Sequence, residues 1–214
     1  MSALPALQSY LTPEEYLALE RQSETKSEYR QGETFALAGA NRGHNLIAFN
    51  LAGALSPQLK HRPCEAYVGD MRVKVANAGL YTYPDVTIVC GKAEFEDHED
   101  DTLLNPTVII EILSPSTEAY DRGAKFEFYR TLESLSDYLL VSRSSPTIEH
   151  FKRHADDHWL LATYRGLEAV AAIPSIGCEL RLADVYDKVE WPAEATRLPR
   201  LRRVKAAASY DTAR

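Results

Sequence analysis

The sequence predicts an α+β (α/β) fold in which a mixed sheet is flanked by helices. One observation is the order of the predicted elements, which runs αβββαβ between residues 41 and 142. A second is a pair of runs rich in Val, Ile and Thr, at 86–90 and 107–113, joined by a loop as in long-looped antiparallel strands. A third is an added helix and hairpin that precede this core.

The N-terminal addition begins with a capping box. Residues 12–15 read Thr-Pro-Glu-Glu, with proline at the first helical position, and predict a short helix that ends at about Glu20. Residues 26–37 then predict a small hairpin in which Tyr29 and Phe35 are the packing residues.

The first core element is a long helix over residues 41–60. Proline at 57 and at 63 is expected to disturb and end it. Its apolar stripe is predicted from residues at helical spacing, namely Leu46, Phe49 or Asn50, Gly53 and Ala54, widened by Leu51, Leu55 and Leu59.

Strands and a second helix complete the core. Residues 65–75 alternate as one strand, which forms a meander with the two strands named above. A helix at 121–133 and a strand at 137–142 follow. Further strands are predicted at 147–152, 159–164 and 176–182, and Trp191 is expected to close the last apolar contact.

Two carboxylates stand out in the central hairpin. Asp85 opens the first strand, and the expected register places it opposite Glu111 or Ile112. Glu111 interrupts a nearly continuous apolar run of the kind that is buried on both faces of a sheet. An ionised carboxylate there costs several kcal/mol, on the order of the penalties for buried ions, unless a cation compensates it.

Lys125 raises the same question on the following helix. It shares helical spacing with Phe128, Tyr129 and Leu132, so it lies on the apolar stripe or at its edge. Two carboxylates and an inward lysine fit a magnesium site, in which the lysine orients water or neutralises charge on phosphorus. The alternative from the residues alone is a buried Lys–Glu ion pair, with Asp85 as a strand-end cap.

The residues around these three side chains resemble a known family. Pro84-Asp85 followed by Glu111-Ile112-Leu113 is similar to the PD-(D/E)XK nuclease pattern. The surrounding sequence is similar to the Uma family of restriction endonuclease-like proteins, from about Lys26 to Trp191. The most specific runs are Tyr83-Pro84-Asp85-Val86, Leu104-Asn105-Pro106, Glu111-Ile112-Leu113-Ser114-Pro115-Ser116-Thr117 and Asp121-Arg122-Gly123-Ala124-Lys125.

The resemblance implies a restriction-endonuclease-like core and a magnesium ion, or manganese, held by Asp85 and Glu111. It also implies that Glu28 is a third acid, as a supporting ligand or base, for which an exposed strand carboxylate is the alternative. The lysine of the superfamily pattern is replaced by Leu113, so the resemblance assigns that role to Lys125 on the next helix. Because single-module nucleases that cut both strands often act as pairs, a homodimer is expected.

Composition limits the partners and the compartment. The formal net charge of −7 argues against a protein that coats nucleic acid nonspecifically, but not against a local basic cleft. There is no membrane-length apolar run and no signal-peptide pattern, so a soluble cytoplasmic protein is expected. Cys64, Cys90 and Cys178 are odd in number and widely spaced, which argues against a disulfide framework and a zinc knuckle and favours a reducing cytoplasm.

Several other residues of the sequence are candidates for a functional site. The six acids of residues 94–101 are expected to form a solvated loop rather than a calcium site. His44 is interpreted as a surface group rather than one that faces the site or a phosphate, and Asp70 is a second-tier acid that caps or pairs with Arg72. The histidines at 150, 154 and 158 are rejected as a metal cluster, because their spacing requires a helix and the segment predicts strands.

The sequence therefore predicts a metal-dependent endonuclease that hydrolyses phosphodiester bonds in DNA. The principal alternative is a noncatalytic nuclease-like module that binds DNA or a protein partner. A third possibility keeps the metal but acts on a nucleotide or RNA. Residues 1–192 are expected to form a single domain, and residues 193–214 a flexible basic tail, for which a DNA-holding arm is the alternative.

Overall fold

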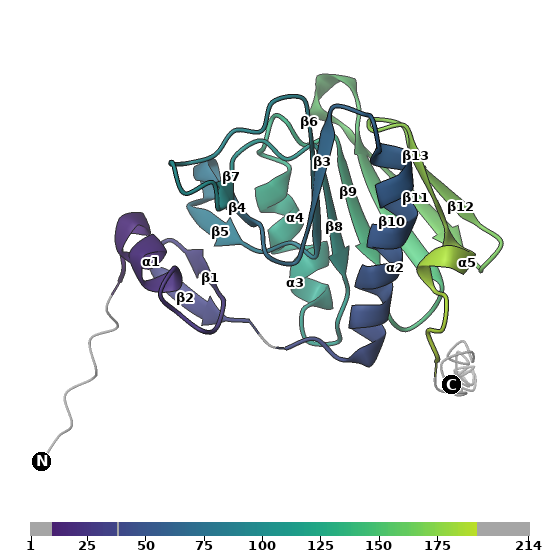
Figure 1. Cartoon of the computed structure of the whole chain (residues 1–214), viewed down its shortest axis with the longest axis horizontal. Helices are drawn as coiled ribbons and strands as arrows, with labels where there is room; N and C mark the ends of the chain where they lie inside the picture. The colour runs from purple at the N-terminus through teal and green to yellow at the C-terminus, as the bar shows by residue number, and fades with distance from the viewer. Residues whose placement is uncertain (1–9, 38, 192–214) are drawn as a thin grey trace, which may run out of the picture.

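The computed structural model describes residues 10–37 and 39–191, and its largest sheet has six strands in the order β11-β10-β9-β8-β6-β3 (Figure 1). Neighbouring strands are antiparallel, except that β8 and β9 run parallel, so the sheet is mixed. Its strands are β3 (Cys64–Val68), β6 (Val86–Cys90), β8 (Val108–Ile112), β9 (Asp137–Val141), β10 (Thr147–Arg153) and β11 (Trp159–Arg165).

One face of this sheet is covered by α2 (Arg42–Leu59), the hairpin of β12 (Val170–Ile173) and β13 (Cys178–Arg181), and α5 (Leu182–Val185). These elements lie together on the right of Figure 1. Alternate strand residues point to this side, because side chains alternate between the two faces of a sheet. In β8 they are Val108, Ile110 and Ile112, and in β9 they are Leu139 and Val141.

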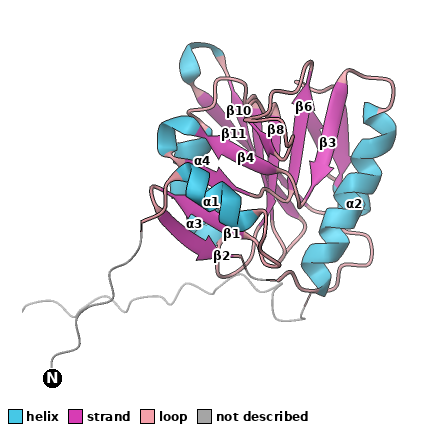
Figure 2. Cartoon of the chain, turned by 60° about the vertical axis from the view of Figure 1, so that its left-hand side comes forward, coloured by secondary structure: helices cyan, strands magenta, loops and turns pink. Residues whose placement is uncertain are grey.

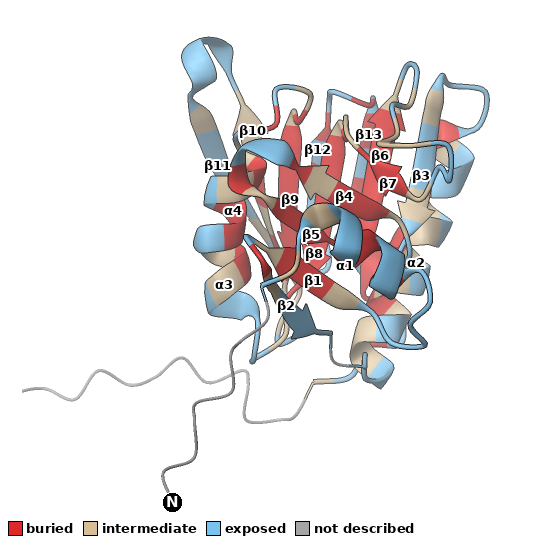
Figure 3. Cartoon of the chain, turned by 90° about the vertical axis from the view of Figure 1, so that its left-hand side faces the viewer, coloured by how far each residue is buried: buried red, intermediate tan, exposed pale blue. Residues whose placement is uncertain are grey.

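The opposite face packs against α4 (Ala124–Tyr129), β4 (Arg72–Val75) and β5 (Leu80–Thr82). The intervening strand residues, Ile109, Tyr138 and Leu140, belong to this second core. α3 (Glu118–Arg122) precedes α4 on the same side. Figure 3 views the molecule from this side and shows that the central strands β6, β8 and β9 are buried, whereas the edge strands β3 and β11 are intermediate or exposed.

β4 and β5 belong to a second sheet, in the order β2-β1-β5-β4-β7, that carries the N-terminal addition. Its other strands are β1 (Ser27–Arg30), β2 (Glu33–Ala36) and β7 (Thr102–Leu103). α1 (Pro13–Glu20) packs on it through a cluster of Tyr16, Tyr29 and Tyr81. Figure 2 shows this unit on the same side of the molecule as α3 and α4, with α2 on the other side.

The predicted α+β class and the αβββαβ order are confirmed. The order corresponds to α2, β3, β6, β8, the α3–α4 pair and β9, and it is preceded by the predicted helix and hairpin. The side chain of Thr12 accepts from the backbone N–H of Glu15, and the Glu15 carboxylate accepts from that of Thr12, so the capping box is present. The β10–β11 hairpin also forms as predicted.

The single strand predicted at 65–75 is wrong. Gly69 has a positive φ of 75°, a backbone conformation that glycine adopts at little cost, and the chain leaves the six-stranded sheet there. β3 stays in that sheet and β4 joins the second sheet. Asp70, in the turn between them, pairs with Lys26 rather than with Arg72.

The apolar stripe predicted for α2 is only partly correct. The buried residues recur at intervals of four, as Ile47, Leu51, Leu55 and Leu59, whereas Phe49 is 76% exposed. Pro57 lies inside the helix, which continues beyond it and ends at Leu59. Phe35, predicted to pack, is likewise exposed.

The helix predicted at 121–133 is divided in two. Gly123 adopts φ −108° and ψ −102°, which are not helical angles, and it separates α3 from α4. The helical region begins at Glu118 and ends at Tyr129, so it lies earlier in the chain than predicted. The break matters because Asp121 lies before it and Lys125 after it.

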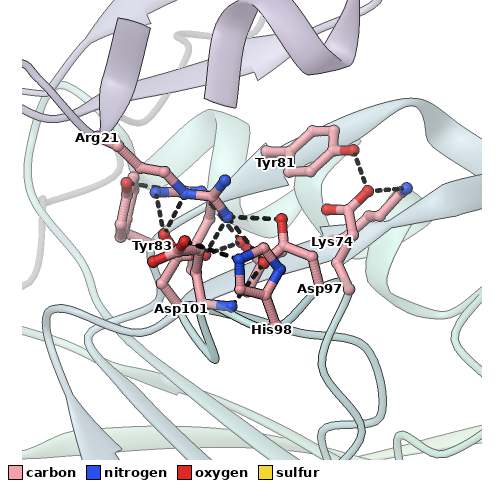
Figure 4. A network of polar contacts seen from close by, with 11 residues as sticks. Arg21, Lys74, Tyr81, Tyr83, Asp97, His98 and Asp101 are labelled. Atoms are coloured by element: carbon pink, nitrogen blue, oxygen red, sulfur yellow. Dashed lines mark hydrogen bonds and ion pairs between the residues drawn. The ribbon is translucent and has the colours of Figure 1, made fainter. Parts of the chain in front are cut away.

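The acidic loop at 94–101 is not simply solvated. Arg21 donates to both Asp97 and Asp101, which ties the end of α1 to this loop (Figure 4). Glu96 accepts from Tyr81 and pairs with Lys74. Three of the loop's acids therefore fasten the second sheet and the N-terminal helix.

The prediction that the cysteines form no disulfide framework is wrong for one pair. Cys64 and Cys90 stand directly opposite each other on β3 and β6 and are disulfide-bonded. Counting cysteines along the chain gave no sign of this, because the pairing depends on strand register. Cys178 is free and buried. The disulfide removes the support that cysteine usage gave to a reducing compartment.

The tail predicted at 193–214 lies outside the described residues. Within residues 10–37 and 39–191, no helix has both the length and the apolar character needed to cross a bilayer.

Candidate active site

Glu111 lies in the middle of the buried sheet, on the face that packs against α4. It follows Ile109 by two residues and therefore shares that residue's face of β8. Its side chain is 5% exposed. Oε1 of Glu111 accepts from the hydroxyl of Tyr129, 2.9 Å away, and lies 2.9 Å from Nζ of Lys125. The two partners come from α4.

Asp85 stands at the entrance of β6, next to Glu111 in register. Because Val86 pairs with Ile110, the same register places Asp85 opposite Glu111, as the sequence predicted. Oδ2 of Asp85 accepts from the backbone N–H of Ile112 at 2.7 Å, and Oδ1 lies 3.0 Å from Nε2 of His44. One strand and one helix therefore fix the orientation of this carboxylate.

Lys125 lies among three carboxylates. Its Nζ is 2.9 Å from Glu111, 3.2 Å from Glu28 and 3.5 Å from Asp121, and its side chain is 7% exposed. The prediction of an inward lysine is therefore confirmed by its position. No ion pair joins Lys125 to Asp85 in the part of the chain that the structure describes.

Glu28 reaches this cluster from the second sheet. It lies on β1 with a side chain that is 9% exposed, so the alternative of an exposed strand carboxylate is wrong. The hydroxyl of Thr82, at the end of β5, donates to the same Oε1 that contacts Lys125. The chain from Thr82 to Val86 thus passes from one sheet to the other through the cluster itself.

The cluster has more negative than positive groups. Three carboxylates, those of Glu28, Glu111 and Asp121, contact Lys125, and Asp85, which stands opposite Glu111, adds a fourth. Burial, together with the charges of Asp121 and Asp85, raises the pKa of Glu111 to about 8, although Lys125 opposes the rise. Burial lowers the pKa of Lys125, but the nearby carboxylates raise it well above its usual value. The ammonium therefore stays charged, and Glu111 keeps its proton to a higher pH than an ordinary glutamate.

Two members of this site were not predicted from the sequence. Asp121 was noted only as part of a motif, but burial raises the pKa of its carboxyl and it lies beside Lys125. The available signal was its spacing of four residues from Lys125. His44 was interpreted as a surface group, yet its side chain is 17% exposed and contacts Asp85. Its position in the first turn of α2 gave no signal until the sheet was in place.

The donor set fits a hard divalent cation. Magnesium prefers a few carboxylate oxygens and completes its shell with water and phosphate. Asp85 and Glu111 supply such oxygens. The positive charge of the ion would offset the excess of carboxylates over ammonium groups in the cluster. Among the described residues, no three His, Cys, Asp or Glu side chains form a ready-made metal cage.

The remaining histidine candidates do not form a site. His150 is buried and its Nε2 lies 2.6 Å from Asp137, which also accepts from Ser175. His154 and His158 flank the turn between β10 and β11. The three histidines thus lie on the predicted β10–β11 hairpin, so their spacing of four residues does not place them on one face of a helix.

Comparison with known proteins gives a consistent result. A family model named Uma2 and described as "Putative restriction endonuclease" matches residues 13–183. The chain is 39% identical over 159 residues to the uncharacterized protein sll1609 of Synechocystis sp., with 74% of this chain and 90% of that protein covered. It is 35% identical over 176 residues to the uncharacterized protein slr1290 of the same organism, with 82% and 91% covered.

A solved structure shares the fold. It is described as a "putative nuclease belonging to DUF820 from Anabaena variabilis", and it superposes with a TM-score of 0.65 at 19% sequence identity. The match covers 82% of this chain and 97% of that one. At this identity the likeness shows a common fold, which agrees with the predicted restriction-endonuclease-like core.

Proposed function

Because the chain belongs to the Uma2 family of restriction endonuclease-like proteins, we propose that it is a metal-dependent endonuclease that hydrolyses phosphodiester bonds in DNA. The observation that carries the proposal is the cluster of four carboxylates and one lysine, in which Glu28, Glu111 and Asp121 contact Lys125 and are buried with it, Asp85 stands opposite Glu111, and the pKa of Glu111 is raised to about 8. A buried site with surplus negative charge and strongly shifted titration is typical of a functional centre.

Four residues of the cluster have a role in this proposal. Asp85 and Glu111 hold the divalent ion, magnesium or alternatively manganese. Such an ion, when bound, lowers the pKa of a water ligand and neutralises charge on a phosphate oxygen. Lys125 supplies a fixed positive charge for the anionic transition state or orients the attacking water. Glu28, which contacts Lys125, is the supporting ligand or general base.

The direct test is cleavage of plasmid DNA by the purified protein with magnesium. We expect cleavage to be lost with EDTA and in the single variants Asp85→Ala, Glu111→Ala and Lys125→Ala. Glu127→Ala is the matched control, because Glu127 is an exposed acid on the same helix as Lys125. If a purified variant that carries all three substitutions cleaves as well as the parent, the activity comes from a contaminant and the proposal fails.

One observation favours a second candidate, a noncatalytic nuclease-like module that binds DNA or a protein partner. Lys125 already contacts three of the acids and acts as their cation without a metal. Calorimetric titration with magnesium or manganese separates the two candidates. The endonuclease proposal requires binding that depends on Asp85 and Glu111, whereas the noncatalytic module predicts none.

The proposal includes a homodimer, because one centre hydrolyses one strand of a duplex. Light scattering coupled to size exclusion measures this directly. A dimer is expected to convert supercoiled plasmid to linear product in one encounter, whereas a monomer is expected to accumulate nicked circles first.

A further inference from the structure

A cavity of about 340 Å³ lies beside the candidate active site. It is lined by the first turn of α2 and by the residues that directly follow the parallel strands β8 and β9, at 113–115 and 142–144. Ligands in sheets with parallel strands commonly bind at these carboxyl ends. The same turn of α2 carries His44, and the last residue of β8 holds Asp85. The cavity therefore lies next to Asp85, although Asp85 is not one of its lining residues.

The exposure of the cluster indicates from which side a substrate reaches it. The side chains of Glu28, Glu111 and Lys125 are 9%, 5% and 7% exposed, so the second sheet and α4 enclose them. Asp85 and His44 are more open, at 21% and 17%. A phosphodiester backbone that reaches the cluster must therefore approach along the Asp85–His44 edge, where the cavity lies.

The positive charge of the cavity comes mainly from Arg143. Its stem lies over the first turn of α2, since a Cβ added at Gly43 would be 3.6 Å from its Cγ. The side chain is half-buried and makes no ion pair or side-chain hydrogen bond with any residue in the described ranges. A guanidinium without a carboxylate partner, held at the wall of a cavity, is suited to bidentate binding of a phosphate.

The other charged groups of the lining are partly compensated. The carboxylate of Glu118 accepts from Arg122 at 2.9 Å, and that of Glu190 lies 3.6 Å from Arg42 with both side chains exposed. The hydroxyls of the lining serines add neutral donors, which come from Ser114, Ser142 and Ser144. Arg143 is thus the lining charge that remains available to a ligand.

We propose that this cavity binds a backbone phosphate of the nucleic-acid substrate next to the phosphodiester that is cleaved, with Arg143 as its principal contact. The inference rests on the proposed function and adds to it a place where the substrate strand is held. A phosphate contact fixes the position of the strand and carries no sequence information. It also shows how a chain with a net charge of −7 binds a polyanion through a local cationic site.

The test is binding of a labelled mixed-sequence DNA duplex by fluorescence anisotropy. All variants are made in an Asp85→Asn background, so that cleavage does not interfere. Arg143→Gln is expected to weaken binding about tenfold, the effect of losing one charged hydrogen bond, and to reduce the slope of log affinity against log salt by about one. Arg143→Lys, which keeps the charge, is expected to lose less. Arg130→Gln is the matched control, because Arg130 lies near the beginning of β9, at the opposite end of that strand from the cavity, and its side chain is exposed.

The outcomes separate this inference from the proposed function. If Arg143→Gln melts like its background and binds DNA equally well, or if Arg130→Gln weakens binding as much, the phosphate site is wrong even when the parent cleaves DNA. If the parent never cleaves DNA but the Arg143 effect and the salt slope appear as expected, the binding site stands and the catalytic proposal falls.

Discussion

Nε2 of His44 lies 3.0 Å from Oδ1 of Asp85, so the first turn of the long helix orients the carboxylate that opens β6. Partners of this kind fix the direction of a metal ligand, and their loss commonly lowers metal affinity 10–100-fold. We therefore predict that His44→Ala weakens binding of manganese or magnesium by roughly tenfold, measured by calorimetry.

The control for that experiment is His98→Ala, because the His98 side chain is 90% exposed and lies in the acidic loop. Glutamine at position 44 keeps a side-chain donor and should restore part of the affinity. Equal affinities in the parent and in His44→Ala would show that the contact has no role in holding the ion.

A second prediction concerns the charge surplus. Burial raises the pKa of Glu111 from 4.5 to about 8, so the folded protein holds a proton that the unfolded chain releases between these values. The contribution of this group to stability is complete below pH 4.5 and is lost as the pH rises through about 8. Without metal, Glu111→Gln should therefore be more stable than the parent at pH 8.5.

The expected gain is on the order of 1 kcal/mol, or about 2–4 °C in melting temperature for a chain of this size. Melting curves in EDTA at pH 5.5 and 8.5 measure it, and the gain should shrink at the lower pH. A variant that is less stable at both values would mean that the Glu111–Lys125 pair is a net stabilising ion pair and that the pKa is not raised.

A third prediction concerns acid unfolding. The hydrogen bond from Arg21 lowers the pKa of Asp101 from 3.8 to about 2. The contribution of a carboxyl with a lowered pKa is present above pH 3.8 and is lost as the pH falls through about 2. Arg21→Gln should therefore be less stable than the parent at pH 6, by about 1 kcal/mol or less because the pair is partly exposed.

Urea unfolding at a series of pH values checks this. The difference between parent and variant should decrease below pH 4, and high salt should reduce it at pH 6. Arg130→Gln, which removes an exposed pair with Glu127, is the reference for a surface charge outside the network. A difference that does not change with pH would contradict the assigned role of Asp101.

The fourth prediction tests which face of α2 is buried. Leu51 is fully buried in the core below the helix, whereas Phe49 is 76% exposed. Leu51→Ala should lower the free energy of unfolding by about 2–5 kcal/mol, and Phe49→Ala should change it by less than about 0.5 kcal/mol. Denaturant melts of both variants decide the point, and a large loss from Phe49→Ala would place the stripe where the sequence pattern predicted it.

The central hairpin was predictable because its signals are local and strong. An apolar run with one acid at Glu111 predicts a buried strand with an embedded charge, and the strand register then places Asp85 opposite it. The inward direction of Lys125 follows from helical spacing with Tyr129 in the same way. These three residues could be named without coordinates because each depends on the period of its own element.

The partners of these residues were harder to predict because they depend on contacts between distant segments. His44 precedes Asp85 by a helix and three strands, and the proximity arises only when α2 packs on the six-stranded sheet. The Cys64–Cys90 disulfide likewise depends on strand register rather than on spacing. The division of the 65–75 segment depends on the backbone angle of Gly69, whose consequence for sheet membership is not local.

The passage of the chain from Thr82 to Val86 has a consequence for engineering. Glu28 is anchored on one sheet and Glu111 on the other, and the connector between the sheets carries Asp85. A small rotation of one sheet against the other therefore alters the spacing of the acids directly. Substitutions that loosen the packing between the two sheets should change the positions of these acids before the protein unfolds. A screen that measures only heat resistance will not detect such substitutions.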